Sequence, residues 1–232
     1  MRELSMRPPM GRRALGQVMR ETVRRNRVRE GSVYLQVSRG SAPRDFLFPA
    51  ESVPRSVMCV ARNGAMAKGD ALAEKGIGVI TTPDLRWGRP DIKTVQLLAP
   101  AMAKEKAKAV GAKEAWLVDR DGFITEGASS NAWIVNDKRE VITRSVDGSI
   151  LKGVTRTVLL ELMRKHGLTL IERSFSLEEA RKAREAFVTS ATNFVMPVVS
   201  IDGVPLGNGS PGLVTCELRS LVLAAARSIT AV

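Results

Sequence analysis

Histidine, cysteine and aromatic residues are scarce in this chain of 232 residues. It contains one histidine, His166, and two cysteines, Cys59 and Cys216, and aromatic residues make up 4% of the chain. A single histidine and two distant cysteines match no metal-binding or redox spacing, so the sequence predicts no metal ligands. It also lacks an apolar run long enough for a membrane-spanning helix, and its opening segment contains no apolar signal core. We therefore expect a cytoplasmic protein with no membrane partner.

Acidic residues are outnumbered, with 24 Asp and Glu against 36 Lys and Arg, which leaves a net charge of +12. Residues 1–30 hold nine arginines and three glutamates, so half of the excess lies in this segment. Such a charge is typical of nucleic-acid-binding proteins, so a basic nucleic-acid-binding protein is one candidate function for this chain. That class needs aromatic side chains to stack on bases, and Tyr34 is the only tyrosine. We therefore expect no nucleic-acid partner.

The hydrophobic fraction of 44% and the charged fraction of 26% are typical of a globular protein. Apolar periodicity predicts helices over about 11–26, 93–111 and 153–167, the second of which ends at Gly111, and a further helix at the C-terminus. Ser176 and Glu179 form a capping pair that predicts one more short helix after residue 176. Strands are predicted at 33–37, 57–61, 76–81, 186–190 and 195–201, and as two hairpins, 115–118 with 123–125 and 131–135 with 141–143. Clustered rather than alternating strands favour an α+β fold. The polar segment before Gly69 suggests a boundary between domains 1–68 and 69–232.

Three polar segments are unusual for a purely structural domain. They are residues 125–131, 151–156 and 189–193, each rich in small or hydroxyl side chains beside an apolar element. The second begins a helix, whose free backbone N–H groups bind phosphate well. Taken singly, each segment is more typical of a cap or a loop than of a ligand contact.

These segments belong to an ordered set of motifs. The set comprises V-Y-L-Q-V followed by S-R-G-S-A-P-R at 33–44, D-I-K-T-V-Q-L-L at 91–98, T-E-G and S-N within 125–131, I-L-K-G-V-T-R at 150–156 and T-S at 189–190. Together they resemble the class IV (fold type IV) pyridoxal-phosphate aminotransferases, and within that family the D-amino acid aminotransferases. The resemblance extends from about residue 20 to residue 212. It implies two unequal α/β domains, with 1–68 as a small domain and 69–232 as a larger, strand-rich domain that binds pyridoxal 5′-phosphate, and a homodimer.

The resemblance assigns the central chemical role to Lys93, which matches the lysine that forms the internal aldimine with the cofactor. A primary amine is required, because only a primary amine forms an iminium and then exchanges with a substrate amine. Its apolar neighbours at 92, 95, 97 and 98 are expected to desolvate the amine and favour nucleophilic attack. Glu126 matches the carboxylate that pairs with the pyridine nitrogen and keeps the ring protonated.

The remaining site residues follow from the same resemblance. Val154 and Thr155 match the helix start that binds the cofactor phosphate, and Arg44 matches an arginine that holds the substrate α-carboxylate by two hydrogen bonds. Further cofactor contacts are expected from Ser129, Ser190 and Ala191.

Two features depart from the family pattern. The relatives usually place a histidine two residues after the arginine at 44, and this chain has Phe46 there. Members also normally begin with an R-G-x-x-F-G-D motif, a V-Y-E segment and an H-x-x-R helix, none of which this sequence contains. We therefore expect either a start codon assigned downstream of the true one or a chain that lacks this segment.

The function implied is transfer of the amino group of a D-alanine-like amino acid to a 2-oxo acid such as 2-oxoglutarate. Within the family, the alternatives are a branched-chain L-amino acid aminotransferase and an aminodeoxychorismate lyase. An inactive remnant that has lost its N-terminal segment is a further alternative.

Overall fold

The computed structural model describes residues 1–64 and 66–229, which form two compact units, Met1–Lys68 and Gly69–Val232. The fold is mixed α and β, as the sequence predicts. No helix in the described part of the chain is both long and apolar enough to cross a membrane. The elements of the first unit are η1 (Arg2–Leu4), α1 (Arg12–Arg25), β1 (Gly31–Ser38) and β2 (Ser56–Asn63).

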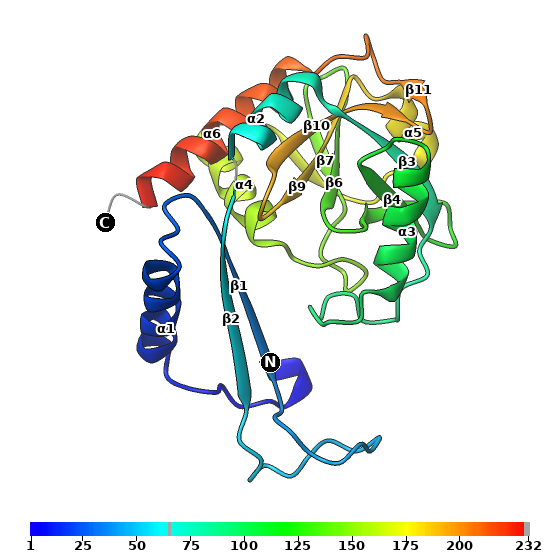
Figure 1. The fold of residues 1–232 in the computed structure, drawn as a ribbon. Helices are drawn as coiled ribbons and strands as arrows, with labels where there is room; N and C mark the ends of the chain where they lie inside the picture. Colours follow the sequence, from blue (N-terminus) through cyan, green and yellow to red (C-terminus); the bar gives the residue numbers. More distant parts are fainter. Residues whose placement is uncertain (65, 230–232) are drawn as a thin grey trace. The chain divides into compact units, whose positions relative to one another are not determined.

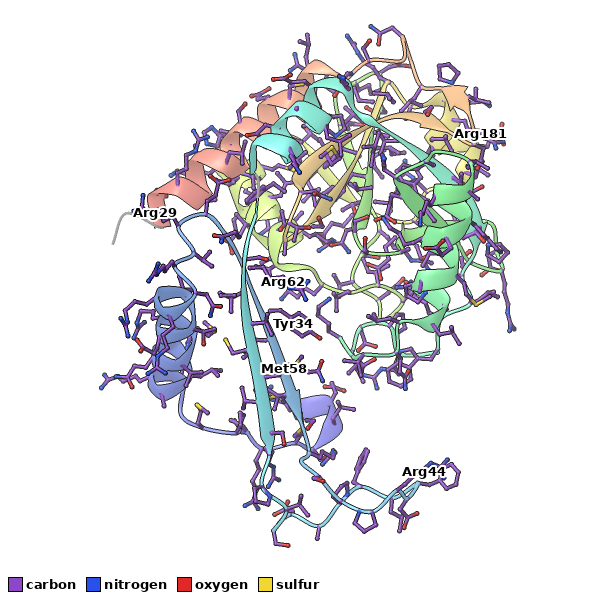
Figure 2. The ribbon with its side chains drawn as sticks, in the orientation of Figure 1. Arg29, Tyr34, Arg44, Met58, Arg62 and Arg181 are labelled. Carbon is purple, nitrogen blue, oxygen red and sulfur yellow. The ribbon has the colours of Figure 1, made fainter. Side chains whose placement is uncertain are left out.

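The first unit is a helix packed on a long β-hairpin. Strands β1 and β2 pair antiparallel in continuous register from Gly31 opposite Asn63 to Ser38 opposite Ser56, and α1 packs against β2. Because side chains alternate between the faces of a strand, Tyr34 and Met58 share one face of the hairpin. In Figure 2 both project away from α1, and Arg44 lies in the loop that joins the two strands.

The second unit is built on one mixed sheet. Its strand order is β5-β4-β3-β10-β9-β6-β7-β8, with β11 paired to β10. The pairs of β3 with β4 and β10, and of β7 with β8, are parallel, and the others are antiparallel. The strands are β3 (Ile77–Pro83), β4 (Glu114–Val118), β5 (Ile124–Gly127), β6 (Asn131–Val135), β7 (Val141–Thr143), β8 (Leu170–Glu172), β9 (Glu185–Ser190), β10 (Phe194–Ile201) and β11 (Val204–Pro205).

Helices cover this sheet on both faces (Figure 1). Along β6, Trp133 and Val135 pack against α4 and α6, whereas Ile134 belongs to the opposite core, which also contains Phe175. This alternation is the period of two expected for a strand buried on both faces. The helices are α2 (Met66–Lys75), α3 (Leu98–Ala109), α4 (Val154–Lys165), α5 (Leu177–Lys182) and α6 (Leu213–Ile229).

The predicted helix start at Lys93 is wrong, because α3 begins at Leu98. Pro100 explains the difference. Proline has no N–H and its ring clashes with the carbonyl four residues earlier, so it is tolerated only in the first turn of a helix. The buried face of α3 consists of Ala103 and Ala107, which pack on β4.

Helix α2 was not predicted. It begins at Met66, inside the polar segment interpreted as a domain boundary. Its glycine, Gly69, lowers helix propensity, so local sequence does not indicate a helix there. Tertiary burial of Ala73 in the core of the second unit stabilises the helix.

Candidate active site

A cavity of about 790 Å³ lies in the second unit. It opens where strand β5 ends, where α4 begins and where β9 ends. Strand pairing brings the segment after β5 close to the end of β9, because Asn131 at the start of β6 is the partner of Thr189, and a hydrogen bond from Thr155 to Ser190 joins the start of α4 to the same place. Seven residues assigned to cofactor contact from sequence line this cavity: Lys93, Glu126, Ser129, Val154, Thr155, Ser190 and Ala191.

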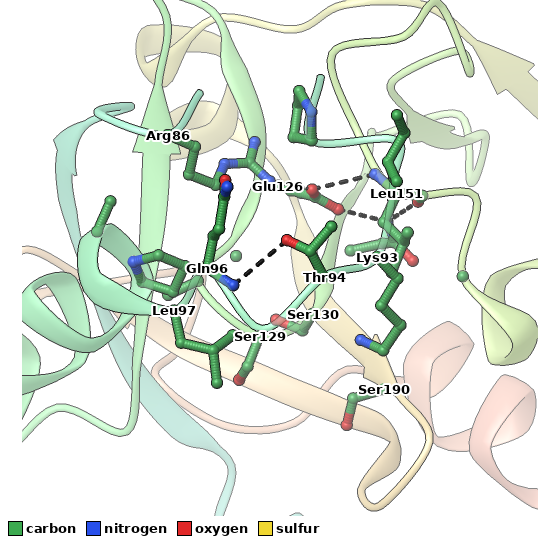
Figure 3. Close-up of a pocket in the computed structure, with 18 of the residues that line it drawn as sticks. Arg86, Lys93, Thr94, Gln96, Leu97, Glu126, Ser129, Ser130, Leu151 and Ser190 are labelled. Atoms are coloured by element: carbon green, nitrogen blue, oxygen red, sulfur yellow. Dashed lines mark hydrogen bonds and ion pairs between the residues drawn. The ribbon is translucent and has the colours of Figure 1, made fainter. Parts of the chain in front are cut away.

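Lys93 lies in the loop between β3 and α3, and its side chain lines the cavity. In Figure 3 its amine points toward Ser190. The expected desolvation by apolar neighbours is not observed, because the side chains at 95, 97 and 98 are 60–76% exposed. They do not enter the core because α3 begins only at Leu98, and they lie on the rim of the same cavity instead.

Glu126 is buried at the end of β5 and accepts hydrogen bonds from three groups. Arg86 donates from Nη1 and Leu151 from its backbone N–H (3.1 Å), both to Oε1, and Asn131 donates from Nδ2 to Oε2 (2.9 Å). Burial raises the pKa of Glu126, and the positive charge of Arg86 acts against this shift. The carboxylate is therefore held in one orientation by its donors (Figure 3).

Arg86 is a residue that the sequence patterns did not single out. Its Nε and Nη2 donate to the two oxygens of Asp84 at 2.9 and 2.7 Å while Nη1 pairs with Glu126. Burial disfavours the ionised form of Asp84, but the hydrogen bonds and charge of Arg86 outweigh it and lower the pKa of that carboxyl. An ion pair formed by a loop has no periodic sequence signal. Only its position five residues before the motif at 91–98 could have drawn attention to it.

The start of α4 presents free donors to the cavity. Its N-cap residue Gly153 has no side chain to accept from the first-turn N–H groups, and no side-chain cap is formed. Thr155 donates from Oγ1 to the carbonyl of Ser190 at 3.0 Å, which joins the helix start to the end of β9. The Ser190 hydroxyl accepts from the N–H of Asn193 (3.2 Å), so its own proton is available to a ligand. This end of the cavity has the chemistry of an anion site.

Ser129 and Ser130 form a different wall of the cavity. Both hydroxyls donate to Glu114 Oε2, at 2.8 and 3.0 Å, and Glu114 is itself buried. A hydroxyl that already donates its one hydrogen bond can only accept hydrogen bonds from other partners. These two side chains therefore present acceptors to the cavity, in contrast to the donors at Ser190 and α4.

Arg44 belongs to the first unit. It lies exposed in the loop between β1 and β2, with its guanidinium carbon 5.6 Å from the centroid of the Phe46 ring. The residues that line the cavity all come from the second unit.

The cavity residues fit pyridoxal phosphate, the group that the sequence resemblance implies. The site offers an amine to bind an aldehyde, an ion-paired carboxylate to accept from a protonated pyridine nitrogen, and the free N–H groups of a helix start to bind a phosphate. Among the described residues, no cluster of His, Cys, Asp or Glu is suited to a metal ion.

Comparisons with known proteins agree with this chemistry. Residues 1–201 match the family model for amino-transferase class IV. The D-alanine aminotransferase of Bacillus licheniformis is 40% identical over 203 residues, which cover 87% of this chain and 70% of that protein.

Solved structures share the fold. A branched-chain amino acid aminotransferase from T.th., complexed with N-(5′-phosphopyridoxyl)-L-glutamate, superposes with a TM-score of 0.83 at 26% identity, covering 97% of this chain and 74% of that one. A Legionella pneumophila protein whose structure is titled as a 4-amino-4-deoxychorismate lyase has the same TM-score at 19% identity, and the match covers 96% of this chain and 80% of that one. At this identity the likeness shows the fold alone. The family match and the 40% identical relative show that the chain belongs to the class IV aminotransferases, enzymes that use pyridoxal 5′-phosphate as their cofactor.

Proposed function

We propose that this aminotransferase transfers the amino group of a D-amino acid, D-alanine or one similar to it, to a 2-oxo acid such as 2-oxoglutarate. The observation that carries the proposal is the cavity in which Lys93, the ion-paired Glu126 and the uncapped start of α4 meet. The choice of a D-amino acid is supported by the relative named D-alanine aminotransferase and by R-G-S-A-P-R at 39–44.

Bound pyridoxal phosphate supplies an aldehyde that holds the amino group and a ring that accepts the electron pair released at the substrate Cα. In this proposal Lys93 holds the cofactor before substrate arrives. Once the substrate amine had replaced it, the freed Lys93 amine would be placed to take the proton from the substrate Cα. The exposed position of Lys93 gives a substrate direct access to its amine.

Two further groups hold the cofactor in place. Glu126 accepts a hydrogen bond from the protonated ring nitrogen, because its carboxylate is fixed by three donors and has acceptor capacity left. The N–H groups of Val154 and Thr155, with the hydroxyl of Ser190 and the backbone of Ala191, bind the phosphate. Ser129 completes the contacts as an acceptor, since its hydroxyl already donates a hydrogen bond to Glu114.

Substrate binding is assigned to Arg44. A guanidinium recognises a carboxylate with two parallel hydrogen bonds, and Arg44 is exposed and free of ion pairs in the first unit as described. In this proposal the first unit is the small domain of the family and the second is the cofactor-binding domain, and the enzyme acts as a homodimer. Phe46, Leu47 and Phe48 support the dimer, because they are 94%, 78% and 65% exposed on one loop.

The test is a visible spectrum of purified protein with added pyridoxal phosphate, before and after D-alanine. We expect a yellow absorbance band that D-alanine bleaches, and that Lys93→Ala abolishes, because only the amine at 93 captures the aldehyde. Lys138→Ala is the matched control, since Lys138 is exposed in the turn between β6 and β7 and does not line the cavity. An equal band in wild type and Lys93→Ala would contradict the proposal.

Substrate choice separates this proposal from its relatives. Pyruvate production from D-alanine is expected to exceed the consumption of L-leucine in a racemate assay. The reverse result would identify a branched-chain L-amino acid aminotransferase, which the solved structures at 26–28% identity also represent. Release of pyruvate from aminodeoxychorismate alone would identify a lyase instead.

A further inference from the structure

Three charged side chains form a buried cluster on the wall of the cavity: Asp84, Arg86 and Glu126. Their side chains are 13%, 11% and 5% exposed, and Arg86 and Glu126 line the cavity directly. The guanidinium reaches both carboxylates at once and also donates to the carbonyl of Ser149 at 3.2 Å. These three side chains carry a net charge of −1, and the buried guanidinium of Arg156 also interacts electrostatically with Glu126.

The hydrogen bonds distinguish the two oxygens of Glu126. Oε1 accepts from Arg86 and from the N–H of Leu151, so both of its lone pairs are used. Oε2 accepts only from Asn131, at 2.9 Å, which leaves one lone pair. A single free acceptor position on a buried carboxylate is suited to one cationic N–H donor.

We infer that Arg86 is a positioning residue for the cofactor ring: it saturates Oε1 and maintains Glu126 as a carboxylate, so that Oε2 receives the protonated pyridine nitrogen. This inference rests on the proposed function, which assigns Glu126 to the ring nitrogen. It adds Arg86 as the residue that keeps Glu126 ionised and correctly oriented for that contact. Arg86 acts through Glu126 and needs no contact with the substrate.

The physical need for Arg86 comes from burial. A carboxylate removed from water without a partner becomes protonated, and the nearby negative charge of Asp84 adds to this tendency. A protonated Glu126 would donate a hydrogen bond to an unprotonated ring nitrogen. The ring would then lose the positive charge that lets it accept electrons. Asp84 in turn fixes the guanidinium by two hydrogen bonds, so the geometry does not depend on Glu126 alone.

The test measures the protonation of the ring nitrogen, not turnover. The probe is 4′-deoxypyridoxine 5′-phosphate labelled with ¹⁵N in the ring, which has no aldehyde and therefore binds without Lys93. Its ¹⁵N chemical shift is followed by NMR between pH 6 and 9, and its affinity is measured by fluorescence titration. In wild type we expect a protonated nitrogen over the whole range.

The variants separate charge from orientation. Arg86→Met and Arg86→Gln are expected to leave the bound nitrogen unprotonated at the upper end of the range and to weaken binding about 10-fold or more, the usual effect of losing a charged hydrogen bond. Arg86→Lys keeps the charge and is expected to restore protonation. Arg86→Met with Asp84→Asn restores the net charge of −1, so protonation should return while the affinity stays low.

The matched control is Arg89→Met. Arg89 pairs with Asp91 at the same two-residue spacing, but its side chain is 48% exposed and does not line the cavity. It is expected to bind the probe as wild type does.

A wild-type ¹⁵N shift and affinity in both Arg86→Met and Arg86→Gln would overturn the inference. If Arg86→Met fails to fold, Arg86→Gln, which keeps an N–H donor for Glu126 without the charge, decides alone. A wild-type chain that binds the probe but shows no Lys93-dependent absorbance would instead refute the proposed function, so the two failures are distinguishable.

Discussion

Gly153 determines, at the scale of a single residue, how the backbone enters α4. Its φ is +61°, a left-handed conformation that glycine adopts freely and other residues do not. A Cβ at this position would lie 2.2 Å from Oδ1 of Asn131, the residue that also donates to Glu126. The start of α4 and the carboxylate of Glu126, which the proposed function assigns to the phosphate and to the ring nitrogen, are therefore coupled through Asn131.

Replacement of Gly153 by alanine should affect both ends of the cavity. We expect Gly153→Ala to lower the free energy of unfolding by about 2–3 kcal/mol, from backbone strain and from displacement of Asn131, and to weaken 4′-deoxypyridoxine 5′-phosphate binding. Denaturant titration and fluorescence binding measure the two effects. Gly148→Ala is the control, because Gly148 has a φ of +94° but no atom within 4 Å of an added Cβ. Equal losses in the two variants would show that strain alone, and not the contact with Asn131, is responsible.

Residues that the sequence motifs assign to one site lie together in the structure where each belongs to a contiguous motif. Glu126 beside Gly127, and Val154 with Thr155 after Gly153, lie in such motifs, and all of them line the cavity. Arg86 and Glu114 were missed because their roles arise from contacts 40 and 15 residues away in the chain. A local pattern contains no information about which distant side chain accepts a hydrogen bond.

At the scale of helices and strands, local signals located most of the fold. The cap at Ser176 is confirmed, since its hydroxyl accepts from the N–H of Glu179. Both predicted hairpins form, because a strand buried on one or both faces is encoded by its apolar residues and its turn. The order of strands in the sheet could not be predicted from local signals. Strand β10 lies between β3 and β9, and β3 and β10 are more than 100 residues apart in the chain, so no local pattern specifies their pairing.

Helix α6 depends on a buried carboxylate at its start. Glu185, on β9 and 6% exposed, accepts from the N–H groups of Val214 and Thr215 at 3.1 and 2.8 Å and from the Thr215 hydroxyl at 2.8 Å. A negative charge at a helix N-terminus is stabilised both by these donors and by the helix dipole. Glu185 therefore attaches α6 to the central sheet.

Glu185→Ala should leave three buried donors without an acceptor. We expect it to lower the free energy of unfolding by about 3 kcal/mol, as measured by urea denaturation. Glu217→Ala, on the same helix, is the control: its side chain is 48% exposed and 3.8 Å from Arg139, so a change within about 0.5 kcal/mol is expected. A small effect for Glu185→Ala would mean that apolar packing of Leu218 and Val222 alone holds the helix.

Charge and apolar exposure act together at the scale of the whole molecule. The chain has a net charge of +12, so two copies repel each other at low ionic strength. The exposed loop at 46–48 favours association, because it presents large apolar side chains to water. The balance between these two effects determines whether the proposed homodimer is populated at a given salt concentration.

The dimer is therefore expected to become tighter as salt rises. Sedimentation equilibrium should give a mass of twice 25.2 kDa at 0.5 M NaCl and a larger monomer fraction at 0.05 M, because screening removes the repulsion and leaves apolar burial intact. Phe46→Ser with Phe48→Ser should weaken the association by up to about 1,000-fold, since each buried phenyl ring contributes about 2 kcal/mol and 1.4 kcal/mol is tenfold. Val110→Ser, at a residue 69% exposed beyond α3, is the control. A mass of one chain at both salt concentrations would exclude the dimer, and a dimer that dissociates as salt rises would indicate charge pairing, not apolar contact, as its basis.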